Sequence, residues 1–169
     1  MSKNDYQAID AVVNIWTDEA LAQRPAWGTD FFSGKMNADK GLVSKGISLE
    51  QMLEQLDAAG IERAFLIAAR SGRPGLPGCY HMPYEIVAKA VAKYPKRFHG
   101  LAGIDPYTGM KGVRELEHAV KNLGLNGPAF AASADDGPGA ASAARRIAAS
   151  SSRETSAISS EISSALEGK

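Results

Sequence analysis

Four side chains of kinds that bind or transform small molecules follow the ends of predicted strands. Asn14 comes directly after an apolar run, while Arg70, Arg73 and His81 belong to one loop rich in Gly and Pro. Arginine can hold a carboxylate through two parallel hydrogen bonds, and histidine exchanges a proton near neutral pH. We therefore predict that these four residues bind substrate. The alternative is that the arginines are solvated and that backbone groups satisfy His81.

The histidines and the cysteine do not combine into a metal or nucleophile site. The three histidines lack metal-ligand spacing. His99 shares a strand face with Leu101, which favours a core or interface position, and His118 lies among charged helix residues, which favours solvent. Cys79 and His81 form a weak Cys-x-His pair without an evident orienting acid. We predict no metal ligands within this chain and assign no catalytic residue.

Alternating strand and helix signals must position these residues. The strand signals are apolar runs at 8–13, 62–69, 97–105 and 125–131. The helix signals lie at 17–23, with Thr17 as N-cap, at 49–59, at 83–94 and at 109–123. Ser48 and Gln51 form a capping box before the second of these helices, which Gly60 ends. Residues 25–47 are expected to form a long loop.

This alternation predicts an α/β fold with a parallel sheet. In such folds binding and catalytic groups gather at the carboxyl ends of the strands. Asn14, the loop at 70–81 and the segment 105–107 follow such ends.

The composition changes near residue 130. All 12 aromatic residues lie in 1–130, whereas 21 of the 39 residues in 131–169 are Ala or Ser. So few large apolar groups cannot offset the entropy cost of ordering a chain. We predict a globular part over 1–130 and a low-complexity tail over 131–169 that is disordered or weakly helical.

Charge and cysteine usage exclude several classes of function. The 19 basic and 19 acidic residues balance to a net charge of zero, which does not support nucleic-acid binding. Neither a signal peptide nor an apolar run of membrane-spanning length is present in the sequence. A single cysteine, Cys79, excludes an internal disulfide. We predict a cytoplasmic protein that binds neither nucleic acid nor membrane.

Two stretches resemble a known family. These are ISLEQMLEQLDAAGIERAFLIA and YHMPYEIVAKAVAKYPKRFHGLAGIDPYTGMKGVRELEHAVKNLGLNG. They resemble the amidohydrolase-related family, in the branch of aminocarboxymuconate-semialdehyde decarboxylase, over about residues 5–127. The resemblance implies a (β/α)₈ TIM barrel, a divalent metal such as zinc, and hydrolysis or decarboxylation of a small acid. About three and a half βα units of such a barrel are recognisable.

The sequence departs from the family at the expected metal ligands. The first-strand His-x-His positions fall on Val12 and Asn14, and Asn14 offers zinc only a neutral oxygen. The family pattern also stops after Gly127, which suggests a reading-frame change or a truncation.

Two functions of different classes follow. The first is an amidohydrolase-related hydrolase or decarboxylase of a small acidic compound, truncated here and inactive alone. The alternative is a catalytically silent barrel fragment or interaction module. Open sheet edges further predict self-association.

Overall fold

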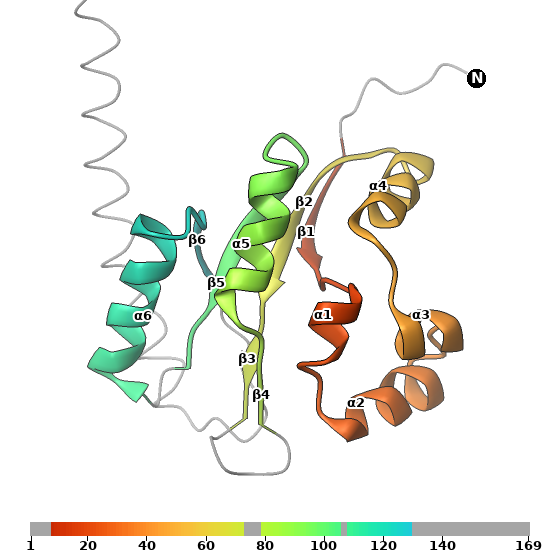
Figure 1. Cartoon of the computed structure of the whole chain (residues 1–169), viewed down its shortest axis with the longest axis horizontal. Helices are drawn as coiled ribbons and strands as arrows, with labels where there is room; N and C mark the ends of the chain where they lie inside the picture. The colour runs from red at the N-terminus through yellow and green to blue at the C-terminus, as the bar shows by residue number, and fades with distance from the viewer. Residues whose placement is uncertain (1–7, 73–78, 106–107, 130–169) are drawn as a thin grey trace, which may run out of the picture.

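Four parallel strands form the central sheet of the computed structural model, which describes residues 8–72, 79–105 and 108–129 (Figure 1). In spatial order the strands are β1 (Ala8–Val13), β2 (Ile61–Ala68), β5 (Phe98–Gly103) and β6 (Gly127–Ala129). Every neighbouring pair is parallel. The predicted α/β fold, a run of successive βα units of a partial barrel, is therefore confirmed.

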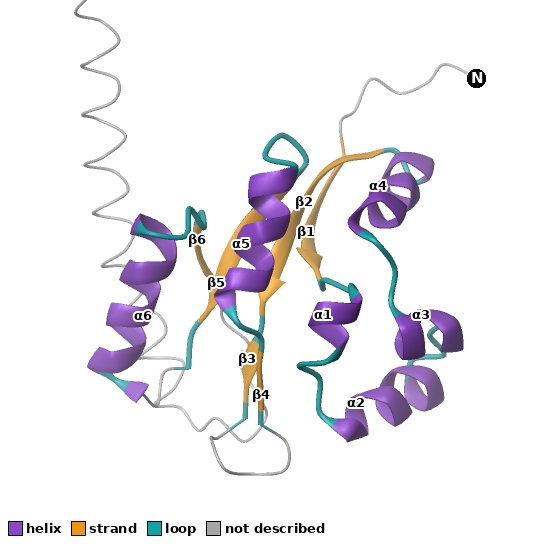
Figure 2. Ribbon diagram, viewed as in Figure 1, coloured by secondary structure: helices purple, strands orange, loops and turns teal. Residues whose placement is uncertain are grey.

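Three helices pack against this sheet (Figure 2): α4 (Leu49–Ala58), α5 (Tyr84–Lys93) and α6 (Met110–Lys121). Side chains of a strand alternate between its two faces. The face toward the helices carries Ala64, Leu66 and Ala68, all fully buried. The opposite face carries Phe65 and His99, half-buried, with ring centroids 5.4 Å apart. His99 thus lies outside the core between sheet and helices.

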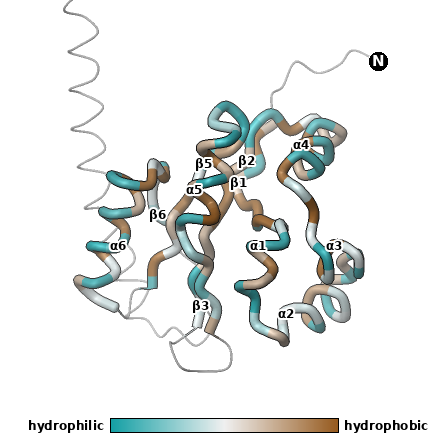
Figure 3. The backbone as a smooth tube through the Cα atoms, viewed as in Figure 1, coloured by the Kyte–Doolittle hydropathy of each residue, from teal (hydrophilic) through white to brown (hydrophobic). Residues whose placement is uncertain are grey.

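One apolar cluster joins the sheet to the helices. It includes Leu56 of α4, Val87 of α5 and Leu116 of α6. Figure 3 shows the hydrophobic residues running along the central strands, while polar residues alternate with them on the helices. The cluster fixes how the strand ends sit relative to α5 and α6, and these are the elements that build the site described below.

The predicted ends of the early helices are confirmed. The Ser48 N–H donates to Gln51 Oε1 at 2.9 Å, and the Gln51 N–H donates to Ser48 Oγ at 3.2 Å. Gly60 follows α4 with a φ of +72°, which favours glycine. Thr17 caps α1 (Asp18–Leu21) with its side-chain oxygen. These ends depend on residues close in sequence, which explains why the sequence predicts them.

Residues 25–47 do not form the predicted loop. They contain α2 (Ala26–Asp30), the π-helical turn η1 (Phe31–Lys35) and α3 (Lys40–Lys45). Such short helices show no clear apolar period. Contacts from elsewhere hold them, since the Trp16 and Phe32 rings meet edge to face with centroids 5.0 Å apart.

The segment 70–81 begins and ends in strand rather than loop. β3 (Arg70–Ser71) pairs antiparallel with β4 (Tyr80–His81), beyond the carboxyl end of β2. Strands of two residues are too short to show an alternating pattern. Arg73 and the predicted tail at 131–169 lie outside the described residues. Within the described part of the chain, no helix is long and apolar enough to cross a membrane.

Candidate functional site

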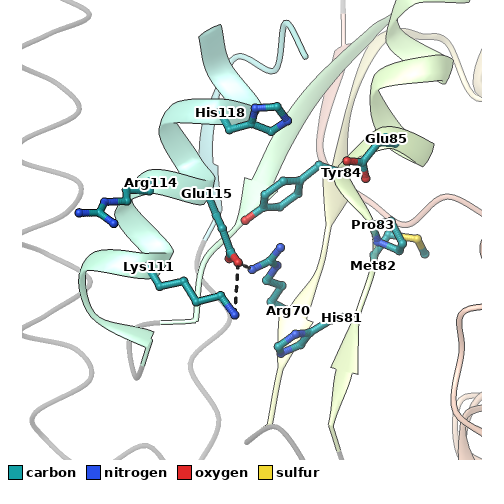
Figure 4. A pocket seen from close by; sticks show the side chains of 10 residues that line it. All are labelled: Arg70, His81, Met82, Pro83, Tyr84, Glu85, Lys111, Arg114, Glu115 and His118. Atoms are coloured by element: carbon teal, nitrogen blue, oxygen red, sulfur yellow. Dashed lines mark hydrogen bonds and ion pairs between the residues drawn. The ribbon is translucent and has the colours of Figure 1, made fainter. Parts of the chain in front are cut away.

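A cavity of about 570 Å³ lies beside the hairpin of β3 and β4, between the start of α5 and one side of α6 (Figure 4). Arg70 and His81 are cross-strand neighbours in the hairpin, and both line the cavity. The rest of its wall comes from Met82, Pro83, Tyr84, Glu85, Lys111, Arg114, Glu115 and His118. The structure thus brings together two of the four predicted substrate-binding residues.

The Arg70 guanidinium is held on several sides. Its Nη1 donates to Glu115 Oε2 in an ion pair, and its carbon Cζ lies 4.3 Å from the centroid of the Tyr84 ring. Its Nε is buried without a hydrogen-bond partner among the described residues. Only 15% of the side chain is exposed. The Arg70 guanidinium is therefore fixed in place by the protein, and its strongest contact is the Glu115 carboxylate.

Tyr84 supports this arginine from the start of α5. Its hydroxyl donates to the Gly103 carbonyl oxygen at 2.6 Å, which ties α5 to the carboxyl end of β5. Burial raises the pKa of Tyr84, so the phenol stays protonated and remains a donor. Gly103 itself permits a close approach, because a Cβ there would lie 2.2 Å from Ala68 O and 2.7 Å from Arg70 N.

His81 is the titratable group of the hairpin. Its Nε2 is buried and has no hydrogen-bond partner in the described part of the chain. Burial lowers the pKa of His81 below 6.5, and the Arg70 charge lowers it further, against opposing effects of Asp105 and Glu115. The imidazole is therefore neutral at pH 7 and can accept or donate a hydrogen bond.

The α6 wall of the cavity is a single stripe of side chains that sequence reasoning missed. Lys111, Glu115 and His118 recur at intervals of four and three residues, which places them on one side of the helix. Lys111 Nζ lies 3.9 Å from Glu115 Oε1. His118 is exposed, as predicted, yet it lines the cavity. The spacing of four and three residues predicts that these side chains share one side of the helix. It does not predict that this side faces the hairpin.

Asn14 lies apart from this cavity. It lines a second one of about 310 Å³, together with residues of α3 and α4 such as Leu42, Met52 and Gln55. The structure therefore does not bring Asn14 together with the hairpin residues. Strand order alone places all strand ends at one edge of a sheet, but side-chain direction decides which cavity each residue reaches.

A half-buried arginine, Arg24, links the first strand end to the hairpin. The Arg24 Cζ lies 4.1 Å from the Trp16 ring centroid, 5.1 Å from that of Phe32 and 5.5 Å from that of Tyr80. Its Nη2 also donates to the Ile15 carbonyl oxygen at 3.3 Å. This aromatic cage holds the short helices after β1 against the residue next to His81.

The described residues do not fit a metal ion. No group of three or more His, Cys, Asp or Glu side chains within them could hold one. Val12, at a predicted first-strand ligand position, is 68% exposed, and its side chain has no donor atom.

No protein-family model matches the sequence, and no curated protein matches it. Among solved structures, a 5-carboxyvanillate decarboxylase from Sphingomonas paucimobilis is similar, with a TM-score of 0.52 and 19% identity. That match covers 77% of this chain and 44% of the other. A mutant 5-carboxyvanillate decarboxylase from Novosphingobium aromaticivorans contains manganese and 3-methoxy-4-hydroxy-5-nitrobenzoic acid. Its TM-score is 0.50 and its identity 20%, over 76% of this chain and 43% of the other.

These likenesses establish the fold. The chain has the fold of part of an α/β barrel, as the resemblance to the amidohydrolase-related family predicted. It spans less than half the length of the two decarboxylases that it matches.

Proposed function

We propose that this chain forms one side of a barrel enzyme that decarboxylates or hydrolyses a small organic acid. The observation that carries this proposal is the pairing of Arg70 with His81 on the wall of a cavity beyond the end of β2. Barrels place binding and catalytic groups at this end of their strands. The similar decarboxylases are named for a carboxylated aromatic substrate, which supports an aromatic acid as the ligand.

In this proposal Arg70 binds the carboxylate of the acid. His81, neutral at pH 7, accepts a hydrogen bond or a proton from a second group of the ligand. Asn14 and Arg73 remain proposed substrate-binding residues. Because Asn14 lines the second cavity, it would contact a ligand bound to Arg70 only if that ligand reaches into both cavities.

Only the resemblance to the family and a similar structure suggest a divalent metal for this proposed enzyme. Zinc is implied by the resemblance, and manganese is bound in the Novosphingobium decarboxylase. We propose that any such ion takes its ligands from outside the described residues, since these do not supply them.

A binding role without turnover is the second candidate, and exposed apolar residues on the edge strand favour it. Ile9 and Val12 of β1 are 53% and 68% exposed. An open strand edge with exposed apolar residues promotes association. We expect the purified chain to elute as an oligomer in size-exclusion chromatography with light scattering, and Val12→Lys to shift it toward monomer. A monodisperse monomer at all concentrations would exclude self-association through this edge.

The test of the main proposal is binding and turnover of benzoate and hydroxybenzoates by the purified chain, with and without added Mn²⁺ or Zn²⁺. We expect benzoate to bind in calorimetry and the neutral isostere benzamide not to bind. Arg70→Met should weaken benzoate binding about tenfold or more. Arg63→Met is the matched control, because Arg63 is an exposed β2 cation outside the cavity. Equal losses in both variants would refute the assignment of the site.

A further inference from the structure

We propose that Glu115 occupies the place of the ligand's carboxylate on Arg70, and that an acid binds by displacing it. The inference rests on the proposed function, since it concerns the same cavity. It makes Glu115 a specificity-determining residue, because every acid must compete with a carboxylate that the chain itself supplies.

The existing contacts of Arg70 leave no guanidinium edge open to a carboxylate that binds through two hydrogen bonds. A guanidinium offers a carboxylate two such edges, Nη1 with Nη2 and Nε with Nη2. Glu115 holds Nη1 of the first edge, and Nε of the second is buried without a partner among the described residues. The Tyr84 ring stacks against the guanidinium at 4.3 Å. Bidentate binding of a ligand therefore requires Glu115 to move.

Glu115 has a second cation to which it can move. Lys111 lies one turn earlier on α6, with its Nζ 3.9 Å from Glu115 Oε1. The Lys111 side chain is 76% exposed, and that of Glu115 is 30% exposed, so both are free to turn toward solvent. Displacement thus leaves Glu115 paired with Lys111 while the ligand's carboxylate pairs with Arg70, and no unpaired charge is left buried.

This competition selects among acids. A tethered carboxylate acts at a high effective concentration, so a ligand must add contacts of its own to displace it. Pro83, which is partly exposed on the cavity wall, offers such a contact. The site should therefore take monocarboxylates with a ring or another apolar body and discriminate against acetate.

The test compares benzoate affinity in Glu115→Gln, Glu115→Asp and Glu85→Gln by calorimetry. Glu85→Gln removes the same charge from the α5 side of the same cavity, but Glu85 forms no ion pair within the described residues. Glu115→Asp keeps the charge and shortens the side chain, which separates contact from charge. We expect both Glu115 variants to bind benzoate about fivefold to tenfold more tightly than the unmodified chain, and Glu85→Gln to change affinity less than twofold. Benzamide should bind to none of the variants.

Each outcome decides the matter. Tighter benzoate binding in both Glu115 variants, without a change in Glu85→Gln, supports displacement of Glu115 by the ligand. If benzoate binds more tightly to Glu115→Gln and Glu85→Gln alike, but not to Glu115→Asp, the net charge of the cavity controls affinity. That result overturns the inference, while the proposed function stands. Weaker binding in the Glu115 variants also overturns it. Absence of benzoate binding in the unmodified chain and all variants refutes the proposed function and the inference with it. Circular dichroism confirms that each variant is folded.

Discussion

Replacing Tyr84 with phenylalanine tests how α5 is fixed to the end of β5. The Tyr84 hydroxyl donates to Gly103 O at 2.6 Å, and the residue is only 5% exposed. The substitution removes that donor but keeps the ring against which Arg70 stacks. The Gly103 oxygen then loses a partner at a place that water does not readily reach.

The expected cost follows from this burial. A buried neutral hydrogen bond whose acceptor is left behind is worth about 1–3 kcal/mol of unfolding free energy. For a domain of this size that corresponds to roughly 3–12 °C in the melting temperature. Burial raises the pKa of Tyr84, so the donor is present at both pH 7 and pH 9 and the effect should be equal at the two values.

Urea unfolding followed by circular dichroism measures the effect, with an unchanged slope as the sign that only stability has changed. The matched control is Tyr94→Phe, because the Tyr94 hydroxyl contacts Glu50 Oε1 at 2.5 Å in an exposed position. The control should unfold close to the midpoint of the unmodified protein. If Tyr84→Phe unfolds at the same midpoint as Tyr94→Phe, the hydroxyl does not hold α5 in place and our reasoning is wrong.

Three further predictions concern single residues around the site. Arg24→Lys should lower the unfolding free energy by about 1 kcal/mol, because an ammonium cannot stack flat on the Trp16 ring 4.1 Å away; an unchanged urea midpoint would contradict this. Gly103→Ala should destabilise by about 1–3 kcal/mol, because its Cβ would lie 2.2 Å from Ala68 O, and a stabilised variant in the same assay would disprove the close approach. The His81 imidazole should titrate below 6.5 in NMR spectra, because burial lowers its pKa. The unfolded chain then takes up this proton first, so the contribution of His81 to stability is complete above pH 6.5 and falls as the pH drops toward the folded-state pKa. A measured pKa of 6.5 would remove this pH dependence, and a higher pKa would reverse its sign.

The elements of the fold follow largely from the sequence. The sequence predicts the four strands of the central sheet and the three long helices with ends within a few residues, because capping groups, glycines with positive φ and apolar periods act between neighbours in the chain. Ser48 with Gln51 is the clearest case, since both hydrogen bonds of the predicted capping box form. The resemblance to barrel decarboxylases pointed to the same architecture, which the similar structures bear out.

The site depends on contacts that no local pattern encodes. Residue type and position after a strand identified Arg70 and His81, but Glu115 lies 45 residues beyond Arg70 and reaches it only because α6 packs beside the hairpin. The same dependence on packing put Asn14 in another cavity and stabilised helices that the sequence suggested were loop. The sequence by itself therefore determined the four strands of the sheet, the three long helices and two of the groups on the cavity wall. The tertiary structure alone decided which charges meet there, because side-chain direction and helix packing set distances between residues remote in the chain.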